Sequence, residues 1–343
     1  MLIYIKFLII LIYTFGLNFF FNKLDFLKDK KSVFKHKNLI SKSIIPPFSG
    51  GLLLIISILI FIPNEFYIFK IFLFLIFLIG FFSDLNFLKS PNLRFLFQII
   101  TVVIFVYFLN INISSIRVEN IDLLLENNFF NLFFTTFCIL IIVNGTNFID
   151  GVNTSVIGYY LISLLFLSYL TQNFSMVDLT LEHLNLIIFC LICLFILNFF
   201  EFLYLGDSGA YLISLFTGIV LIEIANQNPL ISPYYIANLL WYPAYEILFS
   251  IIRKIKNRKS AFNPDNGHLH QLLYLNIEVY FGNKKISNTL TGCIINLYHL
   301  IFVFIVSTDY SNTKYQVFMI ILSVLIYNLT YYILKKRIKK ISN

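Results

Sequence analysis

Long runs of apolar residues dominate this chain, and they leave little choice of fold. Crossing about 30 Å of hydrocarbon takes roughly 20 apolar residues in a helix, and such runs recur along the whole sequence. Charged residues make up only 12% of the chain, whereas a soluble domain carries about 25%. Because lipid offers no partner for an unpaired backbone group, the runs must be helices. We therefore expect an all-α integral membrane protein.

Eleven apolar segments are candidates for membrane-spanning helices. The first contains Lys6 and has no small-residue cleavage site after it, so we expect an anchor and not a removable signal peptide. We see no internal repeat and no low-complexity linker, which predicts a single membrane domain over residues 1–343. The expected spans are 2–21, 49–63, 66–82, 95–113, 129–146, 156–171, 184–200, 210–226, 231–252, 289–308 and 315–334.

The basic residues fall almost entirely into alternate loops. With the N-terminus outside, nearly all of the 25 Lys and Arg residues lie in the inside loops and the C-terminal tail, as the positive-inside rule requires. An odd number of spans then places the C-terminus in the cytoplasm, together with loops 22–48, 83–94 and 253–288. The net charge of +8 is thus mainly a topology signal and does not indicate nucleic-acid binding. A secondary role in gathering anionic lipid or nucleotide is compatible with it.

Five polar segments interrupt the apolar chain, and all five fall on the expected cytoplasmic face. Polar groups near a bilayer are costly and usually functional. Gly50 and Gly51 of PPFSGG allow either close backbone approach or plain helix packing. Asp84, at the end of the third span, is either an interface residue or a functional acid. Asp207 of LGDSGA suits a helix N-cap or a magnesium ligand equally well.

The third of these segments, NGTNFIDGVN, carries a polar stripe. Asn144, Asn147, Asp150 and Asn153 recur at every third residue, which on a helix makes one slowly drifting line. Three amides and a carboxylate cannot face lipid. The stripe therefore lines a wet cavity, or it forms a buried hydrogen-bond network between helices.

The fifth segment, NPDNGHLHQLLY, places two imidazoles in a basic loop. His268 and His270 are two residues apart, which is too close for one helical face and unlike the spacing of a zinc pair. On an extended or bent segment they suit contacts to phosphate oxygens. Arg253 and its basic neighbours precede them in the same loop.

In this order, the five segments resemble those of the bacterial polyprenyl-phosphate N-acetylhexosamine-1-phosphate transferases, glycosyltransferase family 4. PPFSGG is similar to the family's P-x-x-G-G, and SDLNFLKSPNLRFLFQ is similar to its D-D-x-x-x-L…R-x-x-x-Q. NGTNFIDGVN and LGDSGA resemble its N-x-x-N-x-x-D-G and G-D-x-G segments. The final H-L-H resembles the sugar-1-phosphate branch more than the peptidoglycan translocase.

The resemblance implies an enzyme of the bacterial inner membrane, with its active site facing the cytoplasm. It would transfer a sugar-1-phosphate from a UDP-N-acetylhexosamine to undecaprenyl phosphate, starting a cell-envelope glycan such as lipopolysaccharide and releasing UMP. The implied metal is Mg²⁺, with Mn²⁺ as an alternative, and the sequence leaves a homodimer open. The implied roles are Asp207 for the metal; Asp84, Asp150, His268 and His270 for catalysis; and Asn144, Asn147, Asn153, Arg253, Gly50 and Gly51 for substrate binding.

Two departures from the family pattern keep other functions open. Ser83 stands where the first acid of an aspartate pair is usual, and Asn153 replaces the last acid of the stripe. A catalytically inactive relative is therefore one alternative. A transporter of a lipid-linked or anionic solute is another, but its ionisable candidates near the midplane are limited to Glu201, Glu223 and Glu246.

Overall fold

The computed structural model describes residues 2–28, 46–171, 181–258 and 267–342 of the chain. Within these ranges the secondary structure is entirely helical, so the expected all-α class is confirmed. Two short 3-10 turns, Asn64–Phe66 and Ser307–Asp309, join longer helices. The α-helices are α1 Leu2–Lys23, α2 Gly50–Phe61, α3 Tyr67–Asp84, α4 Pro91–Phe108, α5 Glu119–Leu125, α6 Asn128–Ile149, α7 Ser155–Thr171, α8 Leu181–Phe199, α9 Gly206–Gln227, α10 Pro233–Leu239, α11 Trp241–Lys256, α12 Leu269–Phe281, α13 Lys284–Val306 and α14 Thr313–Ser342.

Each of the eleven apolar segments expected to span the membrane overlaps helix in the structure, but 231–252 is divided between α10 and α11, and 95–113 runs past the end of α4. Among the described residues, 8 helices are long and apolar enough to cross a bilayer, or 9 if the bent pair α10–α11 forms one span. α2 and α7 are apolar but shorter. A polytopic membrane protein is therefore supported, whereas the span count and the side on which each terminus lies stay predictions.

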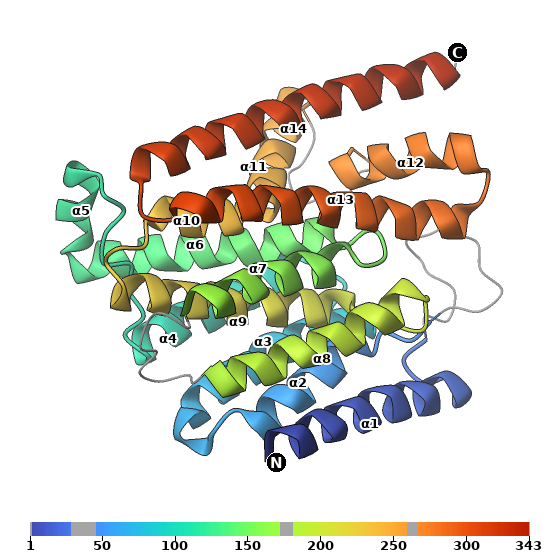
Figure 1. Ribbon diagram of the computed structural model, residues 1–343, viewed down its shortest axis with the longest axis horizontal. Coiled ribbons are helices and arrows are strands. Elements are labelled where there is room, and N and C mark those ends of the chain that lie inside the picture. Colours follow the sequence, from blue (N-terminus) through green and yellow to red (C-terminus); the bar gives the residue numbers. More distant parts are fainter. Residues whose placement is uncertain (1, 29–45, 172–180, 259–266, 343) are drawn as a thin grey trace.

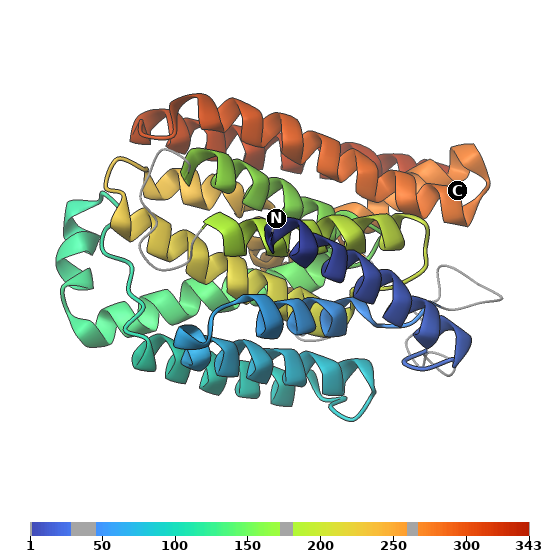
Figure 2. The same ribbon diagram turned by 60° about the horizontal axis from the view of Figure 1, so that its bottom comes forward.

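The helices lie side by side in a bundle with α9 at its centre (Figures 1 and 2). Almost every residue of α9 from Gly206 to Leu221 is buried. α3, α6 and α2 pack against it, while α1 and α14 lie at the periphery (Figure 1). α5 sits at one end of the bundle, and α12 lies at the other end with the C-terminus.

A sharp break separates α10 from α11. The two helix axes differ by 75°, and the carbonyl of Leu239 at the break accepts hydrogen bonds from Tyr159 Oη at 2.9 Å and Ser163 Oγ at 3.3 Å. These hydroxyls satisfy a carbonyl that the broken helix leaves without its usual partner. Gly145 of α6 lets Pro243 approach, because a Cβ at Gly145 would collide with the Pro243 carbonyl. α11 is thereby fixed against the end of α6 that carries the polar stripe.

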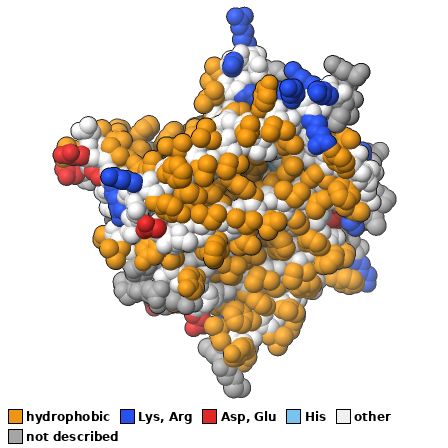
Figure 3. Space-filling model, turned by 45° about the horizontal axis from the view of Figure 1, so that its top comes forward, with side chains coloured by type: hydrophobic (Ala, Val, Ile, Leu, Met, Phe, Trp, Pro, Cys, Tyr) orange, Lys and Arg blue, Asp and Glu red, His pale blue; other side chains and the backbone are white. Residues whose placement is uncertain are grey.

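The surface has the character expected of a lipid-facing bundle. Figure 3 shows apolar side chains covering the middle of one face, with charged side chains gathered towards its edges. Large exposed apolar side chains such as Tyr4, Phe129 and Phe304 lie on the outer sides of α1, α6 and α13. Such broad exposure of apolar groups suits hydrocarbon and not water.

Candidate active site

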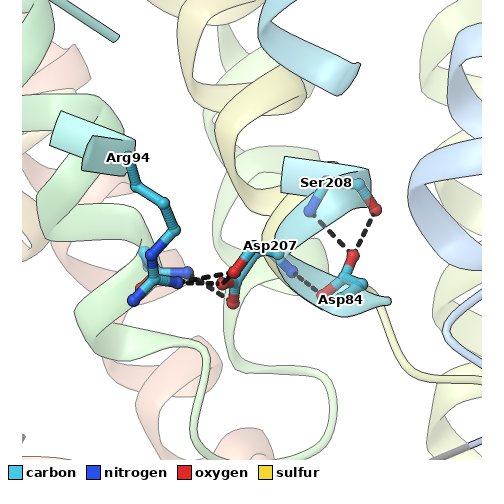
Figure 4. Close-up of polar contacts among 6 residues, drawn as sticks. Asp84, Arg94, Asp207 and Ser208 are labelled. Carbon is cyan, nitrogen blue, oxygen red and sulfur yellow. Dashed lines mark hydrogen bonds and ion pairs between the residues drawn. The ribbon is translucent and has the colours of Figure 1, made fainter. Parts of the chain in front are cut away.

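The first turn of α9 carries Asp207 and is capped by a residue from another helix. Asp84, the last residue of α3, accepts the backbone N–H of Asp207 through Oδ1 at 2.8 Å. Its Oδ2 accepts both the backbone N–H and the hydroxyl of Ser208, at 3.1 and 2.7 Å (Figure 4). The first N–H groups of a helix have no partner within it, and an anion is favoured there by the helix dipole. Asp84 therefore fixes the start of α9.

Asp207 itself is surrounded by donors. Its Oδ2 accepts Ser83 Oγ at 2.6 Å and Arg94 Nη1 at 2.7 Å, and its Oδ1 accepts Asn147 Nδ2 at 2.8 Å. Arg94 Nη1 also donates to Ser83 Oγ at 2.6 Å. Four elements, α3, α4, α6 and α9, thus converge on one carboxylate that keeps 13% of its side chain exposed.

Glycines allow this convergence. Gly206 has φ +78, a left-handed conformation that favours glycine, and a Cβ there would lie 2.6 Å from Asp84 Oδ2. Gly50 and Gly51 donate their N–H groups to the carbonyls of Tyr204 and Leu205, both at 3.1 Å. A Cβ at Gly51 would collide with Ser208. Of the two interpretations of PPFSGG, the structure shows close approach of the backbone to the Asp207 turn. Substrate binding by Gly50 and Gly51 stays a prediction.

The polar stripe divides where α6 ends. Asn147 lies on the last turn and reaches Asp207, and Asp150 is the half-buried C-cap. Asn144 donates to the carbonyl of Leu140 in its own helix at 2.9 Å. Asn153 lies beyond the helix, is buried, and donates to Glu201 Oε1 at 3.0 Å and to Thr289 Oγ1 at 3.3 Å. The stripe therefore serves both of the interpretations left open: Asn147 lies in the site, and Asn153 lies in a network between helices.

His268 is held by a buried acid. It is the N-cap residue of α12, and its Nδ1 lies 3.0 Å from Oε1 of Glu246, which is fully buried in α11. Glu246 Oε2 accepts the hydroxyl of Tyr327 at 2.7 Å. The ring of His268 meets the edge of Phe148, the residue after Asn147, at 5.2 Å. The bent H-x-H segment is thereby joined to the end of α6.

His270 lies against the same end of α6. Its ring sits so close to Gly151 that a Cβ at Gly151 would collide with Nε2. The side chain is buried, and neither ring nitrogen has a hydrogen-bond partner among the described residues. Burial lowers the pKa of His270 well below 6.5, and neighbouring His268 lowers it further. His270 is therefore a neutral imidazole at physiological pH.

Two basic residues at the end of α11 complete this side of the site. Arg253 donates to Ser250 Oγ at 3.2 Å, and its guanidinium lies where a Cβ at Gly267 would collide with it. Lys254 is buried, with Nζ 5.4 Å from the centre of the Phe148 ring. Asp265, the acid of the NPDNGHLHQLLY segment, lies outside the described residues. All five polar segments of the sequence thus meet at one end of the bundle.

The donor set around Asp207 fits a hard divalent cation. Among the described residues, no group of three or more His, Cys, Asp or Glu side chains could hold a metal by itself. A zinc or calcium cage made by protein alone would need such a group. Mg²⁺ instead uses one or two carboxylates and completes its shell with water and substrate phosphates. Asp207, with the amide of Asn147 and the hydroxyl of Ser83, offers that kind of partial site.

Residues 66–225, which contain Asp84, Asn147 and Asp207, match the model of glycosyl transferase family 4. This stretch of the chain is therefore similar to glycosyl transferase family 4. A relative from Thermotoga maritima, described as an undecaprenyl-phosphate alpha-N-acetylglucosaminyl 1-phosphate transferase, is 24% identical over 234 residues. The similarity covers 66% of this chain and 67% of the relative. The expected resemblance to this family is thus confirmed.

The site also contains two residues to which the sequence motifs assigned no role. Arg94 was seen only as part of R-x-x-x-Q, yet it makes an ion pair with Asp207. Glu246 was considered only as a transporter's midplane acid, yet it binds His268. The signal for Glu246 was its place in YPAYE, as an acid three residues after a proline and just before the basic end of α11. For Arg94 the signal in the sequence was its position one helical turn before Gln98. Both residues are polar within an otherwise apolar helix.

Proposed function

We propose that this protein transfers an N-acetylhexosamine-1-phosphate from a UDP-sugar to undecaprenyl phosphate, on the cytoplasmic face of a bacterial inner membrane. The observation that carries the proposal is the environment of Asp207: a carboxylate at a helix start, reached by Arg94, Ser83 and Asn147, at one end of an apolar bundle. Such a place is accessible to a water-soluble nucleotide and a lipid phosphate together. The family and the Thermotoga relative support the same class of reaction.

The reaction needs positioning and charge neutralisation more than covalent help from the protein. An oxygen of the lipid phosphate attacks the phosphorus of the sugar-1-phosphate, and the bond from that phosphorus to the oxygen of UMP breaks. A phosphomonoester has a second pKa of about 6, so the lipid phosphate is already a nucleophile at pH 7. We therefore assign Asp84 to holding the Asp207 turn and not to removing a proton.

Mg²⁺, when bound, would neutralise charge on the diphosphate and on the leaving UMP. Asp207 would hold it, with Asn147 beside it. Arg253, His268 and His270 lie across the end of α6 from Asp207, and we assign them to the diphosphate and the nucleotide. His270, being neutral, can offer a hydrogen bond at a phosphate without adding charge.

Purified protein in detergent gives a direct test. With undecaprenyl phosphate, Mg²⁺ and a panel of UDP-N-acetylhexosamines, we expect UMP release that depends on lipid, on metal and on one sugar. Asp207→Asn should abolish it while the unfolding temperature stays near that of the parent protein. Folded protein that releases no UMP from any donor would contradict the proposal and favour an inactive relative with Ser83 as the cause.

A further inference from the structure

Arg94 occupies one of the two carboxylate oxygens that Asp207 can offer to a metal. Nη1 of Arg94 lies 2.7 Å from Oδ2 of Asp207, and this pair is half-buried, with side-chain exposures of 22% and 13%. Partly buried charges interact more strongly than exposed ones because solvent screens them less. A cation that binds through Oδ2 must therefore compete with a guanidinium already in place.

The surroundings of Arg94 leave two buried polar groups without partners. Its Nε is buried and has no hydrogen-bond partner among the described residues. Gln98, one turn further along α4, is 1% exposed and faces the Tyr211 hydroxyl, but its Oε1 has no hydrogen-bond partner among the described residues. A helical side chain leans towards the preceding turn, so the Gln98 amide leans towards Arg94. Buried polar atoms are costly to leave unpaired, and Arg94 Nε can donate to Gln98 Oε1, which would satisfy both atoms.

We infer that Arg94 is a positioning residue with two places: it holds Asp207 until a divalent cation takes Oδ2, and it then turns towards Gln98. Ser83 makes the exchange feasible. Its hydroxyl donates to Asp207 and accepts from Arg94, but it carries no charge. An acid at this position would keep the guanidinium where it is. The inference rests on the proposed function only for the identity of the metal.

Mn²⁺ binding to the purified protein, without nucleotide or lipid, tests the exchange. Free Mn²⁺ is followed by electron paramagnetic resonance during titration. Arg94→Met removes the competitor, so we expect the Mn²⁺ affinity to rise at least tenfold while UMP release falls. Lys89→Met is the matched control: it removes a positive charge from an exposed position in the loop just before α4, and it should change the affinity less than threefold.

A second variant tests the other half of the exchange, and its effect in the parent protein is decisive even if Arg94→Met does not fold. Gln98→Leu removes the second place for the guanidinium, so it should weaken Mn²⁺ binding several-fold when Arg94 is present and have no effect in the Arg94→Met background. An unchanged or weaker affinity in Arg94→Met, equal effects of Gln98→Leu in both backgrounds, or no binding by any of the proteins would each overturn the inference. Because neither substrate is present, failure of the transferase assay leaves this result intact. Conversely, if the parent protein released UMP but Arg94→Met left the Mn²⁺ affinity unchanged, only the exchange of Arg94 would be refuted, and the proposed function would stand.

Discussion

Asp84 accepts the backbone N–H of Asp207 at 2.8 Å, so the acid that ends α3 caps the helix that carries the candidate metal ligand. Two more hydrogen bonds from Ser208 occupy its other oxygen. In the proposed reaction the carboxylate of Asp84 would therefore act through Asp207.

Replacing Asp84 by alanine should loosen the start of α9. We expect a loss of about 1–2 kcal/mol in the free energy of unfolding, as for other lost helix caps, and a higher Mg²⁺ requirement for UMP release. Asp122→Ala is the control, because the Asp122 carboxylate accepts hydrogen bonds from Ser115 Oγ and the Ile116 N–H at the opposite end of the bundle. It should lower stability without changing the Mg²⁺ requirement. If Asp84→Ala altered the pH profile of the rate but not its Mg²⁺ dependence, Asp84 would be a base.

Gly151 should not tolerate even a methyl group. Gly151→Ala would push its Cβ into His270, so we expect UMP release to fall at least tenfold, about 1.4 kcal/mol of barrier. Gly218→Ala is the matched control, since a Cβ at Gly218 meets nothing within 4 Å. That substitution lies inside α9 and should stabilise the protein slightly. Equal activity in both variants would show that the position of His270 is unimportant.

Glu246 should matter more than its second partner, Tyr327. Glu246→Gln leaves only one good acceptor for two donors, and we expect kcat/KM to fall about tenfold because His268 loses its fixed orientation. Tyr327→Phe removes only the hydroxyl and leaves the contact to His268 in place. Its effect on kcat/KM should be less than threefold. Matching losses in the two variants would instead point to weakened packing of α11 on α14.

His270 should make the fold sensitive to acid. Burial holds the pKa of His270 well below 6.5 in the folded protein, whereas in the unfolded chain it is near 6.5. Below about pH 6.5 the unfolded state therefore binds more protons, and stability falls as the pH falls. Unfolding temperatures in detergent between pH 5 and 8 would measure this. His270→Leu should flatten the slope, and an equally steep slope in that variant would exclude His270 as its source.

The apolar segments could be predicted because the hydrophobicity of a segment depends only on its own residues and not on the partners it packs against. All eleven overlap helix, although 231–252 is split into two helices, and the five polar segments meet as their common side had indicated. The partners within the site could not be predicted in the same way. The hydrogen bond from the Asp207 N–H to the Asp84 carboxylate joins residues that are 123 positions apart in the sequence. Only the packing of α3 on α9 brings them together.

The three-residue spacing of the polar stripe also led to an expectation that is only partly right, because the four residues do not all lie on one helix. A spacing of three residues implies one helix, but α6 ends at Ile149, before Gly151. Beyond that point the chain turns, and Asn153 finds its partners on other elements. Glu246 presented a related problem, because one acid within an apolar run does not reveal which side chain it will meet.

The close seating of α9 has a consequence for how the site works. At Gly51 and at Gly80 a methyl group would collide with Ser208, so α2 and α3 enclose the Asp207 turn backbone against backbone. A turn held in this way has no room to sample other shapes. The entropy of fixing the carboxylate is therefore lost once, when the bundle assembles in the membrane, and not again at each catalytic cycle.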